Sequence, residues 1–360
     1  MKFNRPRSVT PLLSAAGLVA TTASLLTPSG QAAVVSEPVT ASKVTVTTGA
    51  TFVAPAARNA PAYRGQVASV AGDTLILAGS PGWTANQFAP VNLNGTEFYQ
   101  YLVILRHDRS AEGPGNQGDW WLVDSNGTGT LTVEPSGGPF GTTASRLGAG
   151  DTVEVIKLPS IKDLFGTAST LRINADTDFD DTTGDYLRIV SGTSFGSSIM
   201  YHDGSVVSPA GWYFDFAEVG DGAQVTLYPD QAIMVFHQGA ATDLHSSGPL
   251  QSFALTHYLV AGANALATGF GKDALLTASG LQAAGFLDTD FDDTTEDYIR
   301  LVNGTSFGSS IMYHNGTVNP PAGWYLDFGL DATAALPATA GFILFADGAM
   351  TWRQPPPFVP

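Results

Sequence analysis

The sequence predicts an all-β protein, made of a small β-barrel or sandwich and a duplicated β-repeat domain. Short runs rich in β-branched and aromatic residues alternate along the chain with Gly, Asn and Asp turn residues. No amphipathic pattern extends beyond about two helical turns. One segment of the chain is written twice, and each copy reads as a series of short strands.

The duplicated segment runs over 176–216 and again over 288–328, and 32 of its 41 positions are identical at a fixed offset of 112 residues. Copies this similar indicate one folding unit that has been duplicated. Each copy predicts three strands and is followed by a further apolar strand. The predicted strands are 186–190, 198–202, 212–216 and 232–237 in the first copy, and 298–302, 310–314, 324–328 and 341–345 in the second.

The first thirty residues have the layout of a secretory signal peptide. Lys2, Arg5 and Arg7 precede an apolar run over 11–26, and small residues follow up to Ala32 and Ala33. A membrane anchor would need a longer uninterrupted apolar run. We therefore expect residues 1–32 to be cleaved, and the mature protein to be secreted, periplasmic or attached to the cell surface.

The composition restricts the partners that this chain can have. The formal net charge is −16, and it becomes −19 once the basic signal peptide is removed. A chain this acidic repels phosphate backbones, so nucleic acid is not an expected partner. It contains no cysteine, so stability has to come from apolar burial and not from disulfides. No apolar stretch near the C-terminus predicts a membrane span, and 354–360 is expected to be a solvated tail.

The chain in order divides into a linker with a first strand (33–60), a small β-barrel (61–158), repeat 1 (159–252) and repeat 2 (253–353). The first strand is expected over 44–53. The short segments 160–165 and 272–276 are the helical candidates. Barrel strands are expected at 66–70, 74–78, 98–106, 120–123, 130–133 and 152–158.

A weaker echo suggests how the barrel is connected. Residues 49–54 (GATFVA) resemble residues 262–267 (GANALA), which stand at the start of repeat 2. If each repeat begins with its own strand, the barrel is an insertion into repeat 1. Insertions in loops are tolerated because the entropy of loop closure grows slowly with length. The echo therefore predicts that 44–53 pairs with the repeat domain and not with the barrel.

Several runs resemble a family of uncharacterised, exported bacterial β-rich proteins. They are 61–88, above all GSPGWTANQF over 79–88, then 147–156 and 164–166, and the hairpin-then-Trp unit of each repeat. The resemblance covers about residues 36–353. It implies an exported protein with duplicated C-terminal units and carries over no catalytic residue. The chain departs from the family in its Asp-rich loops, and in Tyr213 and Tyr325, where the family has a basic residue.

Two Ser motifs and two His residues invite a catalytic interpretation. Ser194 and Ser306 lie in G-x-S-x-G, the pattern of a nucleophile elbow, but strand-like residues follow where that elbow needs a helix. His202 and His314 stand at hairpin ends, where we expect solvated turn histidines. Neither they nor the other histidines show zinc-ligand spacing.

The strongest chemical signal is a cluster of acidic residues in each repeat. Alternate Asp residues on a loop can turn several oxygens toward one calcium ion, although this pattern is not an EF-hand. The competing interpretation, which the sequence favours, is a solvated acidic loop. The candidate metal ligands are Asp176, Asp178, Asp180 and Asp181 in repeat 1, and Asp288, Asp290, Asp292 and Asp293 in repeat 2.

These observations favour an exported, non-enzymatic β-repeat protein of the cell surface or extracellular matrix that acts in binding or assembly. Its partner would be a glycan or a protein surface. One alternative is a carbohydrate-binding module that uses Trp212 and Trp324, although tryptophans in this context are more often buried. A second alternative is a secreted hydrolase, which requires Ser194 and His202 to meet in a cleft.

Overall fold

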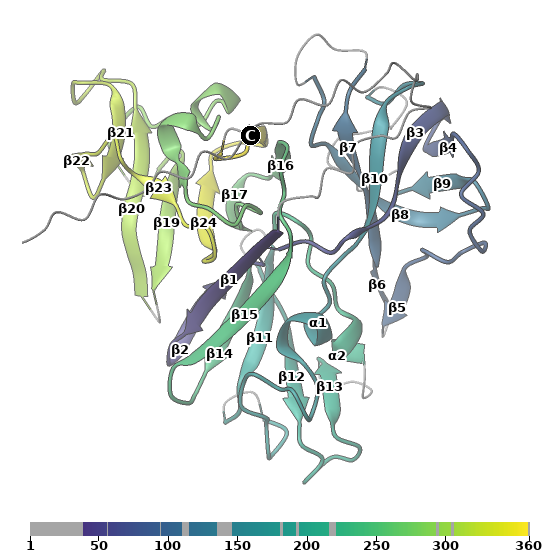
Figure 1. The fold of residues 1–360 in the computed structure, drawn as a ribbon. Helices are drawn as coiled ribbons and strands as arrows, with labels where there is room; N and C mark the ends of the chain where they lie inside the picture. The colour runs from purple at the N-terminus through teal and green to yellow at the C-terminus, as the bar shows by residue number, and fades with distance from the viewer. Residues whose placement is uncertain are drawn as a thin grey trace, which may run out of the picture. The chain divides into compact units, whose positions relative to one another are not determined.

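Strands make up nearly all of the regular structure, which confirms the all-β class (Figure 1). The computed structural model describes residues 39–55, 57–93, 95–109, 115–134, 146–180, 183–191, 194–215, 221–292, 295–303 and 306–358. They belong to one compact unit, 37–360, and the predicted signal peptide lies outside the described residues. No helix in the described ranges combines the length and apolar character that a membrane span requires.

The predicted barrel is a closed barrel of six antiparallel strands. Closure leaves no open sheet edge, and Trp121, Leu131 and Val153 fill the interior. The hairpin of β5 (Val91–Leu93) and β6 (Thr96–Phe98) precedes β7. In order around the barrel the strands are β10 (Thr152–Lys157), β3 (Pro61–Ala71), β4 (Thr74–Leu77), β9 (Thr130–Val133), β8 (Trp120–Asn126) and β7 (Tyr101–His107).

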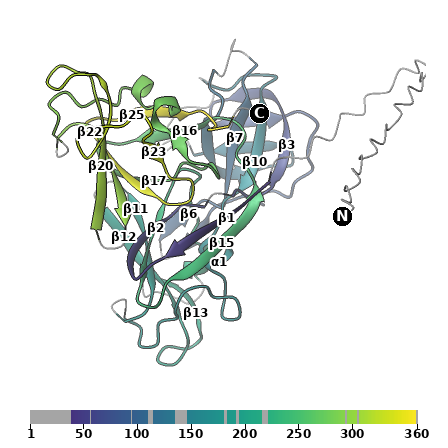
Figure 2. The ribbon, with the colours of Figure 1, turned by 60° about the vertical axis from the view of Figure 1, so that its left-hand side comes forward.

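Each repeat contains one larger antiparallel sheet and a two-stranded ribbon that pairs its first strand with its last. In repeat 1 the sheet order is β13 (Gly211–Phe214), β12 (Ser194–His202), β11 (Tyr186–Ser191), β14 (Ile233–His237) and β2 (Gly49–Val53). The ribbon is β1 (Val39–Val46), which runs along the whole of β15 (Thr242–Pro249), as Figure 2 shows.

Repeat 2 has the same plan. Its sheet order is β17 (Gly262–Leu266), β24 (Phe342–Ala346), β19 (Tyr298–Asn303), β20 (Ser306–His314), β21 (Gly323–Leu326) and β22 (Gly329–Leu330). The ribbon pairs β16 (Leu255–Leu259) with β25 (Met350–Gln354). The smaller elements are β18 (Ala274–Leu275), β23 (Ala335–Leu336), the 3₁₀ turns η2 (Leu276–Ala278) and η3 (Gln282–Ala284), and in repeat 1 α1 (Ile161–Phe165) and α2 (Asp221–Gln224).

The strand pairing confirms that the barrel is inserted into repeat 1. Strand β2 pairs with β14 just as β17 pairs with β24, so the sequence echo marks equivalent strands. The barrel occupies the chain between β2 and α1. The predicted strand 44–53 is two strands, however, because β1 ends at Val46 and the chain turns before Gly49, whose φ of 93° suits glycine.

Reciprocal contacts relate the two repeats by a pseudo-twofold axis. Val53 bridges Ala340, and the equivalent residue Leu266 bridges Gln231, the equivalent of Ala340. The N–H of Ala54 donates to the Thr339 carbonyl at 3.1 Å, and the N–H of Ala267 donates to the Asp230 carbonyl at 2.8 Å. Such self-complementary contact is the signature of an isologous interface. The buried side chains in the shared core are Ala50, Phe52, Val190, Ala232, Met234, Ala263, Ala265 and Ile343.

Two predictions of local structure are wrong and one is confirmed. Ser160 caps α1 through a reciprocal capping box with Asp163, which confirms the helix over 160–165. The segment 272–276 is not a helix, because Ala274 and Leu275 pair with β23. Residues 354–358 are not a solvated tail, because Gln354 ends β25 fully buried and Phe358 packs against the barrel core.

Candidate functional site

Each Asp-rich loop is fixed to the end of one strand, β12 in repeat 1 and β20 in repeat 2. Asp176 forms a parallel bridge with His202, and Asp288 forms the same bridge with His314. The N–H of Asp176 donates to the Tyr201 carbonyl at 2.8 Å, and the N–H of Asp288 to the Tyr313 carbonyl at 2.9 Å. The loops therefore begin from the same anchor in both repeats.

The sequence predicted that His202 and His314 are solvated turn residues. This prediction is wrong, because both side chains are fully buried. The Asp loop covers each ring, a contact between segments that are distant in sequence. Nδ1 of His202 accepts a hydrogen bond from the Gly204 N–H, and Nδ1 of His314 from the Gly316 N–H, both at 2.9 Å. This bond places the proton of a neutral ring on Nε2, which has no hydrogen-bond partner among the described residues. Neither ring can therefore offer Nδ1 to a metal ion.

A strained phenylalanine holds each loop against its histidine. Phe179 and Phe291 have φ values of 64° and 63°, a left-handed conformation that costs on the order of 1–3 kcal/mol outside glycine. The Phe291 ring lies edge-on to His314 and to Tyr325, at centroid distances of 5.1 and 4.9 Å. Phe179 makes the matching contacts in repeat 1. The same strained backbone and the same ring contacts occur in both repeats. The ring packing therefore offsets the strain and fixes the conformation of this part of the loop.

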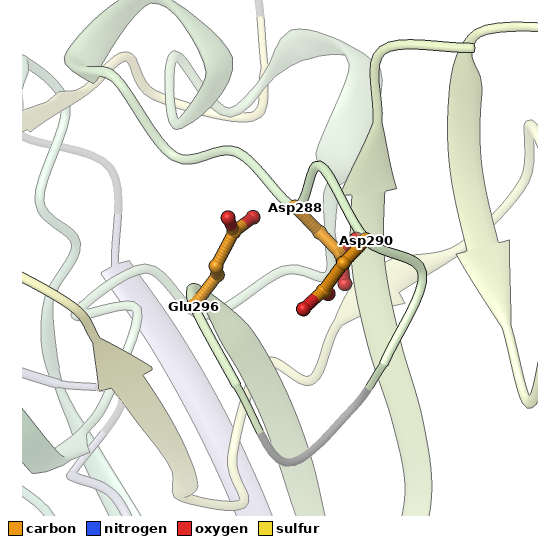
Figure 3. A group of neighbouring side chains, drawn as sticks. All are labelled: Asp288, Asp290 and Glu296. Carbon is orange, nitrogen blue, oxygen red and sulfur yellow. The ribbon is translucent and has the colours of Figure 1, made fainter. Parts of the chain in front are cut away.

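In repeat 2 the loop brings three carboxylates together. One oxygen each of Asp288, Asp290 and Glu296 lies within 4.8 Å of the others. Figure 3 shows Asp288 and Asp290 on one arm of the loop and Glu296 on the other. Glu296 has a φ of 55° and its carboxylate accepts hydrogen bonds from the Thr289 N–H and hydroxyl. No other group of three His, Asp or Glu side chains close enough to share a metal ion occurs among the described residues.

Asp288 is the buried member of this cluster. Its Oδ1 accepts a hydrogen bond from the Phe291 N–H at 2.6 Å, whereas its Oδ2 is buried without a partner among the described residues. Burial raises the pKa of this carboxyl, and the charges of Asp290 and Glu296 raise it further, against the lowering effect of the Phe291 N–H and His314. A cation at this position would offset the cost of burying the Asp288 charge and the repulsion between the three carboxylates.

Repeat 1 has the same buried Asp but lacks the third carboxylate. The Oδ2 of Asp176 is also buried without a partner among the described residues, and its Oδ1 accepts a hydrogen bond from the Asp178 N–H at 3.2 Å. Gly184 stands where repeat 2 has Glu296, and a Cβ there would lie 2.6 Å from the Asp176 Cα. The hydroxyl of Thr183 donates to Asp178 and lowers the pKa of that exposed carboxyl. The described part of this loop therefore brings together only two carboxylates.

The other predicted metal ligands are not brought into either cluster. Asp180 and Asp292 are exposed, and Asp181 and Asp293 lie outside the described residues. The fifth Asp of each loop has a structural role instead. Asp185 accepts hydrogen bonds from the N–H groups of Asn174 and Gln238 and contacts His237, with Nδ1 at 2.7 Å, while Asp297 accepts from the Leu287 and Asp347 N–H groups.

Glu296 is not among the ligands predicted from the sequence, although one signal in the sequence marks it. It is one of only nine differences between the duplicated segments, and it adds a carboxylate beside an existing Asp cluster. The Asp pattern is identical in both copies, so counting Asp residues treats the two loops as equivalent.

The features expected of the two alternative functions are placed differently. Ser194 lies in β12 opposite Ser191, in the β11–β12 hairpin, so strand follows the motif and the hairpin interpretation is confirmed. Trp212 and Trp324 are 2% and 3% exposed, as predicted for core residues. The Trp212 Nε1–H donates to the Gly166 carbonyl at 2.7 Å. Buried rings cannot form a platform for a sugar.

Searches against protein-family models, characterised proteins and solved structures find no match for this chain. The resemblance to a family of exported bacterial proteins therefore stays a prediction.

Proposed function

We propose that this chain is an exported, non-enzymatic β-repeat protein of the cell surface or extracellular matrix, which acts in binding or assembly and holds one calcium ion in repeat 2. The observation that carries the proposal is the cluster of Asp288, Asp290 and Glu296, in which a buried carboxylate oxygen has no hydrogen-bond partner among the described residues. A divalent cation would offset three negative charges that otherwise face one another.

The donor set favours a hard cation. All three side chains offer oxygen, and a loop can add backbone carbonyls and water to reach the six to eight ligands of calcium. Zinc fits poorly, because the chain has no cysteine and His314 commits Nδ1 to a backbone N–H. Magnesium requires near-ideal octahedral geometry, which an irregular loop of this kind does not favour.

Binding is better supported than catalysis. The histidine beside each loop is buried beneath an aromatic ring, and the strand that carries Ser194 lacks the helix of a nucleophile elbow. The glycan alternative loses its proposed platform, since both tryptophans are buried. Two equivalent β units with one specialised loop suit a protein that presents surfaces to a partner.

Export rests on the composition of residues 1–32. Mass spectrometry of the protein recovered outside the cytoplasm should give a mature chain that begins after Ala32. An intact N-terminus on the exported protein would contradict this part of the proposal.

Calorimetric titration of the chelator-treated mature protein tests the calcium site. We expect one site with a Kd of about 10⁻⁴ to 10⁻³ M, the range of extracellular modules. Asp290→Asn should abolish binding, and the matched change in repeat 1, Asp178→Asn, should leave it unchanged. Equal loss in both variants, or no heat in the wild type, would contradict a site specific to repeat 2.

A further inference from the structure

A second site lies away from the Asp loops, in an open groove of about 290 Å³ formed by the barrel and both repeats. Trp120 of the barrel, Tyr228 of repeat 1 and Tyr258 of repeat 2 contribute aromatic walls, and Asp230 contributes a carboxylate. Tyr258 is 41% exposed, although large apolar rings are usually buried. The volume is at the lower end of the range for small-ligand pockets.

Asp230 is buried without a countercharge. The residue is 8% exposed, and among the described residues only its own backbone N–H donates a hydrogen bond to its carboxylate. The closest basic atom is Nδ1 of His257, at 3.8 Å from Oδ2, which is too far for a hydrogen bond. Burial raises the pKa of Asp230 to about 7.

His257 does not supply the missing positive charge. It is fully buried, stacks on Trp352 at 4.1 Å, and its Nε2 is 2.9 Å from Oε1 of Gln354. Burial lowers the pKa of His257 to about 3, against the raising effect of the Gln354 bond, so the ring is neutral at neutral pH. Its Nδ1 is a second acceptor without a donor among the described residues.

The pseudo-twofold axis provides an internal control for this site. The N–H of Ala267 donates to the Asp230 carbonyl, and at the related position the N–H of Ala54 donates to the Thr339 carbonyl. The backbone contact is the same in both places, so the interface between the repeats does not require an acid at 230. Tyr228 and Tyr258 correspond to Pro337 and Thr45, and Asp230 corresponds to Thr339, so the acidic and aromatic side chains occur on one side of the axis only.

We propose that this groove binds a small alkylammonium ion, with its N–H groups donating to the Asp230 carboxylate and its carbon chain against Tyr228, Tyr258 and Trp120. A cation gives the buried carboxylate the opposite charge that no described residue supplies. Aromatic faces attract ammonium groups, and a net charge of −16 raises the local concentration of cations. A neutral alcohol or sugar could use only the hydrogen bond.

Titration of the full-length mature protein with butylammonium chloride tests the proposal. The experiment is run at pH 8 and constant ionic strength, with butanol and glucose as neutral probes. We expect saturable binding of butylammonium alone, weakened at least about tenfold in Asp230→Asn, the equivalent of about 1.4 kcal/mol. Thr339→Ala, at the related position, should bind like the wild type, and so should Glu296→Gly, because this site does not depend on calcium.

Three outcomes would overturn the proposal: no saturable binding of butylammonium, equal binding of a neutral probe, or full binding by Asp230→Asn. If Asp230→Asn does not fold by circular dichroism, Tyr258→Ala takes its place, because this ring is exposed and contributes little to the core. Affinity reduced several-fold in Tyr258→Ala supports the groove, and unchanged affinity rejects it.

Discussion

The two repeats have the same backbone plan but differ in the loop where their carboxylates gather. Both anchor the loop by an Asp–His bridge and hold it with a left-handed phenylalanine. Repeat 2 then places Glu296 where repeat 1 has Gly184, and among the described residues only repeat 2 assembles three carboxylates. The scaffold is therefore set by packing, while a single position decides whether the described part of the loop gathers two carboxylates or three.

A second difference increases the negative charge of repeat 2. In repeat 1 Asp185 contacts His237. The residue of repeat 2 that is equivalent to His237 is Ala346, and the next residue is Asp347 where repeat 1 has Gln238. Burial raises the pKa of Asp297, the backbone N–H groups of Asp347 and Leu287 lower it, and the charges of Asp347 and Glu296 raise it again. No basic side chain among the described residues of repeat 2 takes the place of His237 beside Asp297.

Removal of the equivalent tryptophans tests whether the two cores are energetically alike. Trp212→Ala and Trp324→Ala should each lower the free energy of unfolding by about 3–5 kcal/mol, the cost of emptying a buried aromatic site. Trp212 should cost more by about 1 kcal/mol, since it also loses its bond to the Gly166 carbonyl. Denaturant titration of both variants measures the difference, and a small loss in either would show that the repeats do not depend on equivalent cores.

The basic partner in repeat 1 gives the next largest effect. His237→Ala should destabilise the protein by about 3 kcal/mol, because Asp185 is left buried without its side-chain partner. Repeat 2 has Ala346 at the position equivalent to His237. Ala346→Gly removes no charged partner, so it should lower the free energy of unfolding by less than His237→Ala. Urea unfolding compares the two, and equal losses would mean that the Asp185–His237 contact contributes little.

Asp288 should make the free energy of unfolding depend on pH, and bound calcium should reverse that dependence. Its folded pKa is raised, so the folded state binds more protons and, in chelator, stability falls as pH rises above the unfolded pKa of about 3.9. Asp288→Asn removes this dependence. The variant should therefore gain stability relative to the wild type between pH 4 and pH 7 in chelator, and lose that advantage in excess calcium. Thermal unfolding at both pH values measures the crossing, and its absence would show that Oδ2 of Asp288 is not the destabilising group.

Much of the fold followed from the sequence, because duplication and alternation are local patterns. The echo of 49–54 in 262–267 predicted that the barrel is an insertion, and the strand pairing agrees. The repeated Trp-Tyr strands predicted that Trp212 and Trp324 lie in the core, where both are buried. The helix expected at 272–276 failed because pairing with β23 outweighs weak helical propensity in so short a segment.

The site was harder to predict because it depends on contacts between distant segments. His202 looked like a turn residue, and only the return of the Asp loop across its strand buries it. The contribution of Glu296 depends on a left-handed backbone that brings the two arms of the loop together. Asp230 carries no motif at all, and its lack of a countercharge appears only when the groove is assembled.

The most direct test of the central claim is the effect of calcium on the thermal stability of the wild type and of Glu296→Gly, which gives repeat 2 the residue of repeat 1. At ten times Kd, calcium should stabilise the wild-type protein by about 1.4 kcal/mol, since it binds only the folded state. Glu296→Gly should fold normally and show no shift, while Asp178→Asn in repeat 1 should shift like the wild type. An undiminished calcium shift in Glu296→Gly would contradict the claim that this one residue separates the two loops.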